Sequence, residues 1–485
     1  MLFLGIDIGT TAVKAALFGP DGTVATSWRR DYPTRRAPGG IVEQNPQDWL
    51  DGIAAAVSAF DAEADLQTVR AIGICSHVNT HVFVGEHGSV LANAFVWQDT
   101  RAAEEAAELA ATITSDEAAR WWGSSVPLDA SHALARMQWM RRNHPKLWEE
   151  TRYVLSPKDF CLLKLTGAVV ADPIASVGLV NPSLGYINEL LARVPGALER
   201  LPPLRPFEFI AGSMALGSAG AAVPVVTGTM DAWTSLFGAG AYTPGKGLYM
   251  SGTSEILALV SARRIGAQGV ITFPCVDSAV VSAGPTQSGG DSIRWWAQIT
   301  GRRPMEVFAA AAGASRSDPP VLFLPHLEGE RAPFWDSQLR GAFIGLSSQT
   351  GDAQLALAVL EGVALSARLV LHSLRSAAGL KPAYLLYGGG GSRSHLWSQI
   401  RADCLDLPLH RLAVADAGCL GAAILAAVGI GAFRSVTEAA AAMAKVESRF
   451  YPEPRHKNRY EHMNCAYLDA TRALKSATRH LRDAG

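Results

Sequence analysis

The chain has 485 residues, of which 48% are hydrophobic and 18% charged, and its formal net charge is −1. This composition predicts a folded globular protein of roughly two to four domains and excludes a disordered chain. Without a basic arm or stripe, nucleic-acid binding is not expected. The six cysteines are scattered and form no Cys-x-x-Cys pair, so we expect reduced core thiols, not a zinc site or a disulfide framework.

The N-terminus has neither a basic region nor a small-residue cleavage site, so no signal peptide is expected. The longest uncharged stretch, residues 417–433, is short for a membrane span and predicts a buried helix instead. These features predict a soluble, cytoplasmic protein with no membrane partner.

The first residues predict a β-meander. Residues 2–8 form an apolar run that breaks at Gly9, residues 13–18 resume it, and residues 23–28 suit a third strand after a Gly-Pro-Asp-Gly turn.

Helices and strands then alternate. The helix expected at 46–60 has Asn45 as its N-cap and Pro46 at its first position. The other expected helices are 102–113, 131–144 and 352–376, and further strands are expected at 71–75, 223–226 and 383–387. This alternation indicates an α/β sandwich in each half of the chain.

A pattern like the first hairpin returns in the second half. Residues 247–251 predict a strand, Gly252-Thr253-Ser254 a bend, and residues 256–261 a second strand. One strand–bend–strand unit in each half suggests a duplicated fold, with chance repetition as the alternative. The glycine-rich stretch 238–247 suits a hinge or an ordinary surface loop. We place the boundary there, between domains 1–240 and 241–485.

The residues from Asp7 to Lys14 form the first candidate site. Gly9 permits a tight turn with close backbone approach, and Thr10 and Thr11 offer hydroxyl and N–H donors. With the positive charge of Lys14, this set suits phosphate oxygens, and Asp7 is placed to hold a metal ion through water. A plain hairpin with a polar turn is the alternative.

Asp231 is the second candidate. It follows an apolar run and a glycine turn, at a strand-to-helix junction. In phosphoryl transfer the protein mainly positions the reactants and neutralises charge, and a carboxylate orients the nucleophile. Asp231 is therefore predicted to activate the acceptor hydroxyl. It also suits the N-cap of a helix beginning at Ala232, and one residue can do both.

Two glycine-rich bends follow strands in the second half. One contains Gly252 and Thr253, and the other has four consecutive glycines at 388–391. Such glycines let the backbone approach a flat or charged group, and the adenosine of a nucleotide fits this description. A flexible loop is the alternative.

Taken in order, these motifs resemble those of the FGGY carbohydrate kinases over nearly the whole chain. The matching motifs are Asp-Ile-Gly-Thr-Thr at 7–11, Trp-Gln-Asp-Thr-Arg at 97–101, Ser-Pro-Lys-Asp-Phe at 156–160, Gly-x-x-Asp at 228–231, Gly-Glu-Arg-x-Pro at 329–333, and a long C-terminal signature from 341 to 361.

The resemblance implies an α/β fold of two ribonuclease-H-like (actin-like ATPase) domains with the active site in the cleft between them. Domain 1–240 would hold the sugar and domain 241–485 the ATP, with Mg²⁺ as cofactor; a homodimer is left open. Asp231 would be the general base, and Asp7 would lie near Mg²⁺ with a water molecule between them. The residues expected at ATP are Thr10, Thr11, Lys14, Gly252, Thr253, Gly389, Gly390 and Ser392.

Among family members the chain looks most like the xylulose kinases, so D-xylulose is the expected acceptor. Asn79 replaces the histidine that xylulose kinases usually have, and Ala232 replaces an asparagine after the base. Losing a hydrogen-bond partner can shift specificity strongly. Ribulose, erythritol, erythrulose, glycerol and gluconate therefore stay open as acceptors, as does a non-catalytic sugar-sensing role. The residues expected at the sugar are Val78, Asn79, Trp97, Asp99, Arg101 and Asp231.

Overall fold

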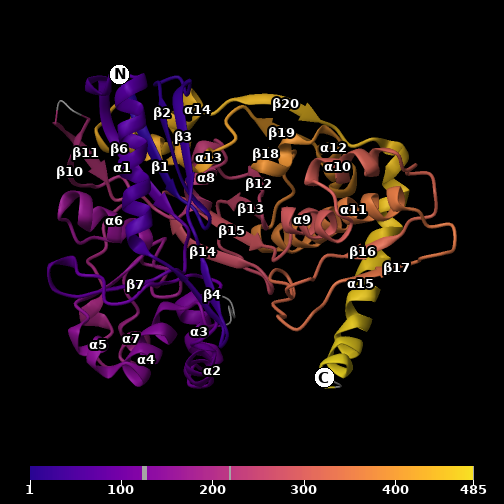
Figure 1. The fold of residues 1–485 in the computed structure, drawn as a ribbon, viewed down its shortest axis with the longest axis horizontal. Coiled ribbons are helices and arrows are strands. Elements are labelled where there is room, and N and C mark those ends of the chain that lie inside the picture. The colour runs from indigo at the N-terminus through magenta and orange to yellow at the C-terminus, as the bar shows by residue number, and fades with distance from the viewer. Residues whose placement is uncertain (123–127, 218–219, 484–485) are drawn as a thin grey trace. The chain divides into compact units, whose positions relative to one another are not determined.

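The structure, a computed structural model, describes residues 1–122, 128–217 and 220–483 (Figure 1). Its contacts divide the chain into two compact units. The first unit comprises Met1–Tyr242 and Asp416–Lys445, and the second comprises Thr243–Ala415 and Val446–Gly485. The expected division into 1–240 and 241–485 differs from this in placing residues 416–445 with the second half.

The first unit contains a six-stranded sheet with the order β10-β11-β6-β1-β2-β3. The first three strands form the predicted antiparallel meander, while β6 is parallel to β1 and β11 is parallel to β6. The strands are β1 (Leu2–Ile8), β2 (Ala12–Phe18), β3 (Val24–Asp31), β6 (Val69–Ser76), β10 (Ile210–Leu216) and β11 (Ala221–Val226).

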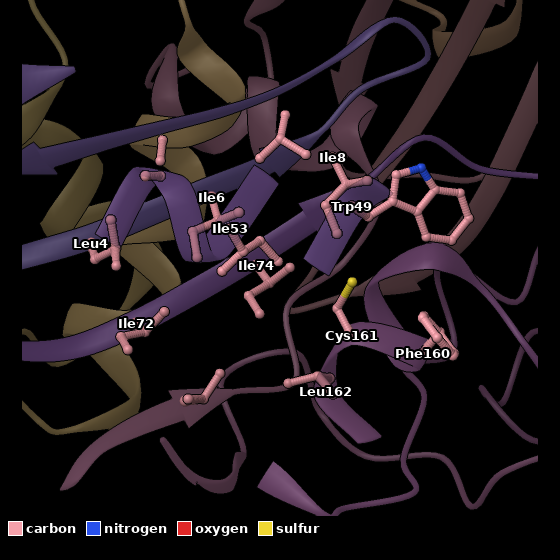
Figure 2. Close-up of a cluster of buried hydrophobic side chains, with 14 of the residues drawn as sticks. Leu4, Ile6, Ile8, Trp49, Ile53, Ile72, Ile74, Phe160, Cys161 and Leu162 are labelled. Atoms are coloured by element: carbon pink, nitrogen blue, oxygen red, sulfur yellow. The ribbon is translucent and has the colours of Figure 1, made fainter. Parts of the chain in front are cut away.

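One face of this sheet packs against α1 (Pro46–Glu63). The predicted cap is confirmed, because the side chain of Asn45 accepts a hydrogen bond from the Gln47 backbone N–H. Alternate side chains of β1 enter the core here, since successive strand residues point to opposite faces. Figure 2 shows this cluster, in which Leu4, Ile6 and Ile8 lie with Ile72, Ile74, Trp49, Ile53, Phe160, Cys161 and Leu162.

The other face packs against α13 (Ala417–Gly429), which the sequence correctly predicted as a buried helix. The fit is close: a Cβ atom on Gly5 would lie 1.9 Å from the Cys419 carbonyl oxygen, and one on Gly73 would lie 1.9 Å from that of Ala422. Because these two strand positions carry no side chain, α13 packs directly against the first sheet. Residues 416–445 therefore belong to the first unit. Beside α13 lies α8 (Asp231–Gly238).

The second unit contains a seven-stranded sheet with the order β14-β15-β13-β12-β18-β19-β20. Apart from β14, its strands repeat the order and directions of the first sheet: three antiparallel strands, then two parallel to the first of them, then an antiparallel edge. The predicted duplication is therefore present in the fold. The strands are β12 (Gly247–Ser251), β13 (Glu255–Ser261), β14 (Ile271–Val276), β15 (Ala279–Pro285), β18 (Leu385–Gly388), β19 (Leu409–Leu412) and β20 (Val446–Phe450).

The long helix α11 (Asp352–Ala378) packs against β13 and β15. Among the described residues it alone is long and apolar enough to span a membrane, and 83% of its most apolar window is buried in the structure.

Smaller elements complete the two units. In the first unit these are β4 (Arg35–Ala37), β5 (Ile41–Gln44), β7 (Val82–Val84), β8 (Ala94–Phe95), β9 (Tyr153–Leu155), α2 (Ala103–Ala111), α3 (Ser115–Trp122), α4 (Ala133–Asn143), α5 (Pro145–Glu150), α6 (Pro157–Thr166), α7 (Asn188–Leu191) and α14 (Val436–Met443). In the second unit these are α9 (Gly290–Ile299), α10 (Pro304–Ala312), β16 (Leu322–Leu324), β17 (Ala342–Ile344), α12 (His395–Leu405) and α15 (Pro454–Asp483). The helices predicted at 102–113 and 131–144 are present as α2 and α4, each slightly shorter than expected.

Candidate active site

Asp7 and Lys14 are cross-strand partners in the β1–β2 hairpin. The Lys14 Nζ atom lies 3.7 Å from Asp7 Oδ2 and 2.9 Å from Asp416 Oδ1. Burial raises the pKa of Asp7 above its ordinary value, Lys14 opposes this increase, and Asp416 adds to it. Burial lowers the pKa of Lys14, but Asp7 and Asp416 outweigh it and raise that pKa overall. Lys14 therefore stays charged between two carboxylates. Asp416 was not among the predicted site residues, because no local pattern connects it to β1.

The bend between these strands is held from several sides. The Gly9 N–H donates to the Ala12 carbonyl at 3.0 Å, and the Tyr32 hydroxyl donates to the Gly9 carbonyl. The indole N–H of Trp97 donates to the Thr10 hydroxyl oxygen at 3.0 Å. Thr11 is left exposed at the tip. Trp97, expected at the sugar, thus directly supports Thr10, expected at the phosphates.

Asp231 is the first residue of α8, which follows β11 after the short loop 227–230. The preceding residue, Met230, pairs with Ser76 at the end of β6 in a parallel bridge. The N-cap position belongs to Met230, so the expected capping by Asp231 is corrected; its Oδ1 atom instead accepts from the Ala232 backbone N–H at 2.7 Å. In open α/β sheets, ligands bind at the carboxyl ends of parallel strands. Asp7 and Asp231 both lie at this edge of the first sheet.

His77 lies between them, directly after β6. Its Nδ1 atom is 2.9 Å from the Ile8 carbonyl oxygen, which can only accept, so Nδ1 carries the proton. Burial lowers the pKa of His77 to about 4, so the ring is neutral at pH 7. Its ring also packs edge-on against Trp49 at a centroid distance of 6.0 Å. His77 therefore supports the strand ends as a neutral donor.

Val78 and Asn79 are half-buried in the loop that follows. The Asn79 amide donates to the Ser131 hydroxyl at 3.2 Å, and Asn79 itself has a left-handed backbone with φ 53°. The buried guanidinium of Arg136 donates to the Asn79 carbonyl at 2.6 Å, and also to the carbonyls of Phe95 and Val96. The backbone of this loop is thereby tied to the residues just before Trp97.

Asp99 and Arg101 bind each other. The Arg101 Nη2 atom lies 2.7 Å from Asp99 Oδ2 and 2.7 Å from Glu43 Oε1. Asp99 also accepts from the Val42 backbone N–H at 2.7 Å, and only 1% of its side chain is exposed. Both oxygens of Asp99 accept hydrogen bonds from the protein itself. Glu43 was not predicted, because it lies in none of the motifs that the sequence contains.

The second unit brings its two predicted bends together. Gly389 has φ 85° and ψ 177°, and a Cβ atom there would lie 2.4 Å from the Ser251 carbonyl oxygen. Gly252, Thr253 and Gly390 are exposed beside this contact. The hydroxyl of Ser392, in contrast, is buried and donates to the Gly389 carbonyl at 2.7 Å. Ser392 thus shapes the loop from within.

A fully buried ion pair, Glu255 with Arg401, lies beneath these bends. Glu255 accepts from the hydroxyls of Ser251 at 3.0 Å and Tyr249 at 2.6 Å. Arg401 donates to the Tyr387 hydroxyl at 2.6 Å, and its guanidinium stacks 3.4 Å from the Trp397 ring centroid. The pair links β12, β13, β18 and α12, and no pattern in the sequence identified it.

The Gly-Glu-Arg segment supports the same region. Glu330 accepts from the Gln287 backbone N–H at 2.6 Å, and Arg331 donates to the Thr286 carbonyl at 2.6 Å. Nearby, the first residue of α9, Gly290, donates its N–H to the Gly252 carbonyl at 2.9 Å. The start of α9 is thereby hydrogen-bonded to the Gly252–Thr253 bend, and the Gly-Glu-Arg segment holds residues 286–287 just before it.

The described residues contain no group of three or more His, Cys, Asp or Glu side chains that could hold a metal ion. Mg²⁺ does not need one, because it is usually bound through one or two carboxylates, substrate phosphates and several waters. The carboxylates of Asp7 and Asp416 beside Lys14 fit a Mg²⁺ ion of this kind.

The two units contain sheets of the same strand order, and each sheet has a Gly-Thr bend. The Asp–Lys pair and Asp231 lie at the carboxyl edge of the first sheet. Together these features define a two-domain sugar kinase of the actin-like ATPase fold. Residues 2–238 match the N-terminal domain of the FGGY family of carbohydrate kinases, and residues 247–430 match its C-terminal domain. The chain belongs to this family, and it is a phosphotransferase that acts on a sugar and ATP.

Three similar proteins are named as kinases. A xylulose kinase from Escherichia coli strain K12 is 30% identical, with 90% of this chain and 92% of that protein covered. A glycerol kinase from Geobacter sp. strain M21 is 28% identical, with coverage of 94% and 96%. The crystal structure of a xyloylose kinase from Brucella ovis superposes with a TM-score of 0.87 at 27% identity, covering 98% of this chain and 100% of that one.

Proposed function

We propose that the protein is a cytoplasmic enzyme that transfers the γ-phosphoryl group of ATP to a hydroxyl of a ketopentose, D-xylulose, with Asp231 as the general base. The observation that carries this proposal is the position of Asp231, which begins α8 next to the end of β6, at the sheet edge that also holds Asp7. A carboxylate at such a position orients an acceptor hydroxyl and accepts its proton.

In this proposal the first unit binds the sugar and the second the nucleotide. Lys14 and the Thr10–Thr11 bend hold the terminal phosphates, and Gly252, Thr253, Gly389 and Gly390 lie along the nucleotide. Mg²⁺, when bound, neutralises phosphate charge, and Asp7 holds it through water. Ser392 contributes by shaping the 389–392 loop, given its hydrogen bond to the Gly389 carbonyl.

The sugar contacts are proposed at Val78, Asn79, Trp97 and Asp231, with Asp99 and Arg101 acting beside them. Because Asp99 and Arg101 pair with each other and with Glu43, their contribution is to hold the segment that carries Trp97. The Asn79 amide faces Ser131, and Ala232 offers no polar group. These two positions favour testing acceptors other than xylulose, and the similarity to a glycerol kinase supports including polyols.

Coupled measurement of ADP release tests the proposal across xylulose, ribulose, erythrulose, erythritol, glycerol and gluconate. We expect sugar-dependent turnover with the highest kcat/KM for xylulose. The D231N variant keeps the size of the side chain but removes the base, so kcat should fall about 10²- to 10⁴-fold while ATP binding is kept. The D51N variant makes the same change on the exposed side of α1 and should retain full activity.

Three outcomes would contradict parts of this assignment. Full activity of D231N would refute the base. A higher kcat/KM for glycerol or gluconate would reassign the acceptor and leave the kinase intact. Tight sugar binding without turnover of any acceptor would indicate a non-catalytic sugar sensor.

A further inference from the structure

A fully buried charged cluster lies under the candidate active site. The Lys158 Nζ atom, at the start of α6, is 2.5 Å from Asp159 Oδ1 and 2.9 Å from Asp172 Oδ2. The side chains of Lys158 and Asp172 are both 0% exposed. Charged groups are almost never buried this completely unless they are paired, and removing one partner leaves a strongly unfavourable charge. Removing Lys158 would therefore leave two buried carboxylates without their counter-charge.

The cluster reaches the loop that carries Asp231. Asp172 Oδ1 accepts a hydrogen bond from the Thr229 hydroxyl at 2.7 Å, and Thr229 is itself 0% exposed. The same oxygen accepts from the backbone N–H groups of Ile174 at 3.0 Å and Ala175 at 2.9 Å. Because Lys158 binds the other oxygen, the Asp172 carboxylate is held from both sides. The Thr229 hydroxyl hydrogen is thus directed at a fixed acceptor two residues before Asp231.

The cluster also reaches the neighbouring strand. The Lys158 backbone N–H donates to the Ser76 hydroxyl at 3.3 Å, and Ser76 pairs with Met230, the residue before Asp231. Between Ile74 and the loop there is no space to adjust, since a Cβ atom on Gly228 would lie 1.8 Å from the Ile74 carbonyl oxygen. The backbone from 228 to 230 is therefore fixed on one side by β6 and on the other by Asp172.

We propose that Thr229, through Asp172 and Lys158, is a positioning residue for the phosphoryl-transfer step. This inference rests on the proposed role of Asp231 as the base. Thr229 touches no reacting atom in this scheme. It holds the start of α8 so that the Asp231 carboxylate meets the acceptor hydroxyl in a reactive geometry. A misplacement of about 1 Å at such a group lowers turnover about 10²-fold.

The chain contains a matched control in the same loop. Thr227 is also 0% exposed, but its hydroxyl donates to the Phe209 carbonyl at 3.1 Å, away from the charged cluster. The T229V and T227V variants each remove one buried hydroxyl and add one methyl group. A purely structural contribution predicts the same result for both. Positioning of Asp231 predicts a difference in kcat.

The test compares steady-state kinetics and thermal unfolding of the full chain. We expect T229V to lower kcat about 10- to 100-fold with an unchanged KM for ATP, T227V to keep kcat, and the two to have similar Tm values. T229S keeps the hydroxyl and should restore most of kcat. A shared loss of kcat in both valine variants, wild-type kcat in T229V, or failure of T229S to restore turnover would overturn the proposal.

The D231N variant distinguishes failure of the positioning role of Thr229 from failure of the proposed base role of Asp231. If D231N is inactive and T229V is fully active, the base assignment stands and the positioning role fails. If D231N retains full activity, the base assignment itself fails.

Discussion

Each unit has a hairpin of the same form, but the polar and apolar residue pairs nearest its bend differ between the two units. In the first unit the strand pair nearest the bend is Ile8 with Val13, and the next is Asp7 with Lys14. In the second unit the nearest pair is Ser251 with Glu255, and the next is Met250 with Ile256. The polar and apolar pairs have exchanged places.

Strand geometry explains the result of this exchange. Successive residues point to opposite faces of a sheet. Ile8 and Val13 enter the hydrophobic core, which leaves Asp7 and Lys14 on the face where α13 begins. Ser251 and Glu255 instead point inward to Arg401, so their charge is used for internal structure. The same duplicated hairpin thus carries a charged pair at the sheet edge in one unit and an internal ion pair beneath exposed backbone in the other.

The largest expected effect is on the buried pair of the second unit. R401M removes the charge that compensates Glu255, and breaking such a pair by removing one partner costs about 3–5 kcal/mol. Urea unfolding of the full chain, followed by tryptophan fluorescence, measures this loss. The control is R303M, at a side chain that is 83% exposed in a surface pair, where the midpoint should stay close to that of the wild type. Equal midpoints for R401M and wild type would show that the pair is dispensable.

The next effect concerns the charged pair of the first unit. D7N should increase the Mg²⁺ concentration needed for half-maximal turnover about 10- to 100-fold, as expected for a group acting through a coordinated water. Titration of activity with Mg²⁺ measures it, and D416N, at the more exposed partner of Lys14, should have the smaller effect.

The stability of D7N gives an independent check. Burial raises the folded-state pKa of Asp7, so this group favours folding below its unfolded pKa, and that contribution is lost as pH rises through the folded pKa. At pH values above the folded-state pKa, Asp7 therefore does not stabilise the fold, and there the Tm of D7N should equal or exceed that of the wild type. A large fall in Tm would assign Asp7 a mainly structural role.

The smallest effect distinguishes a glycine that sets the backbone conformation of the 388–391 loop from one that is proposed to contact the nucleotide. G389A forces alanine into a backbone region that is essentially reserved for glycine, and it should lower stability by about 1–3 kcal/mol. G390A meets no atom within 4 Å in the free protein and should keep the wild-type Tm. If the nucleotide lies against Gly390, the new methyl group will still weaken ATP binding, as calorimetric titration would show. Unchanged ATP affinity in G390A would remove Gly390 from the nucleotide site.

Local signals located fewer than half of the elements, but these include the strands and helices that carry the candidate site. The meander at 2–31, the Asn45 cap and the strand at 247–251 depend on patterns within a few residues, and tertiary packing agreed with them. Boundaries differed where packing extended an element, as in β3, which continues to Asp31 because it pairs with the whole of β2.

The sequence by itself determined the duplicated α/β organisation, the two glycine-threonine bends and the candidate carboxylates at 7 and 231, because each is encoded by neighbouring residues. Only the tertiary structure decided that Asp416 joins Lys14, that residues 416–445 belong to the first unit, and that Asp172 and Lys158 reach Thr229. These contacts join residues that are tens to hundreds of positions apart. Side-chain periodicity carries no information about such pairs, whereas the close approach of packed strands and helices fixes them.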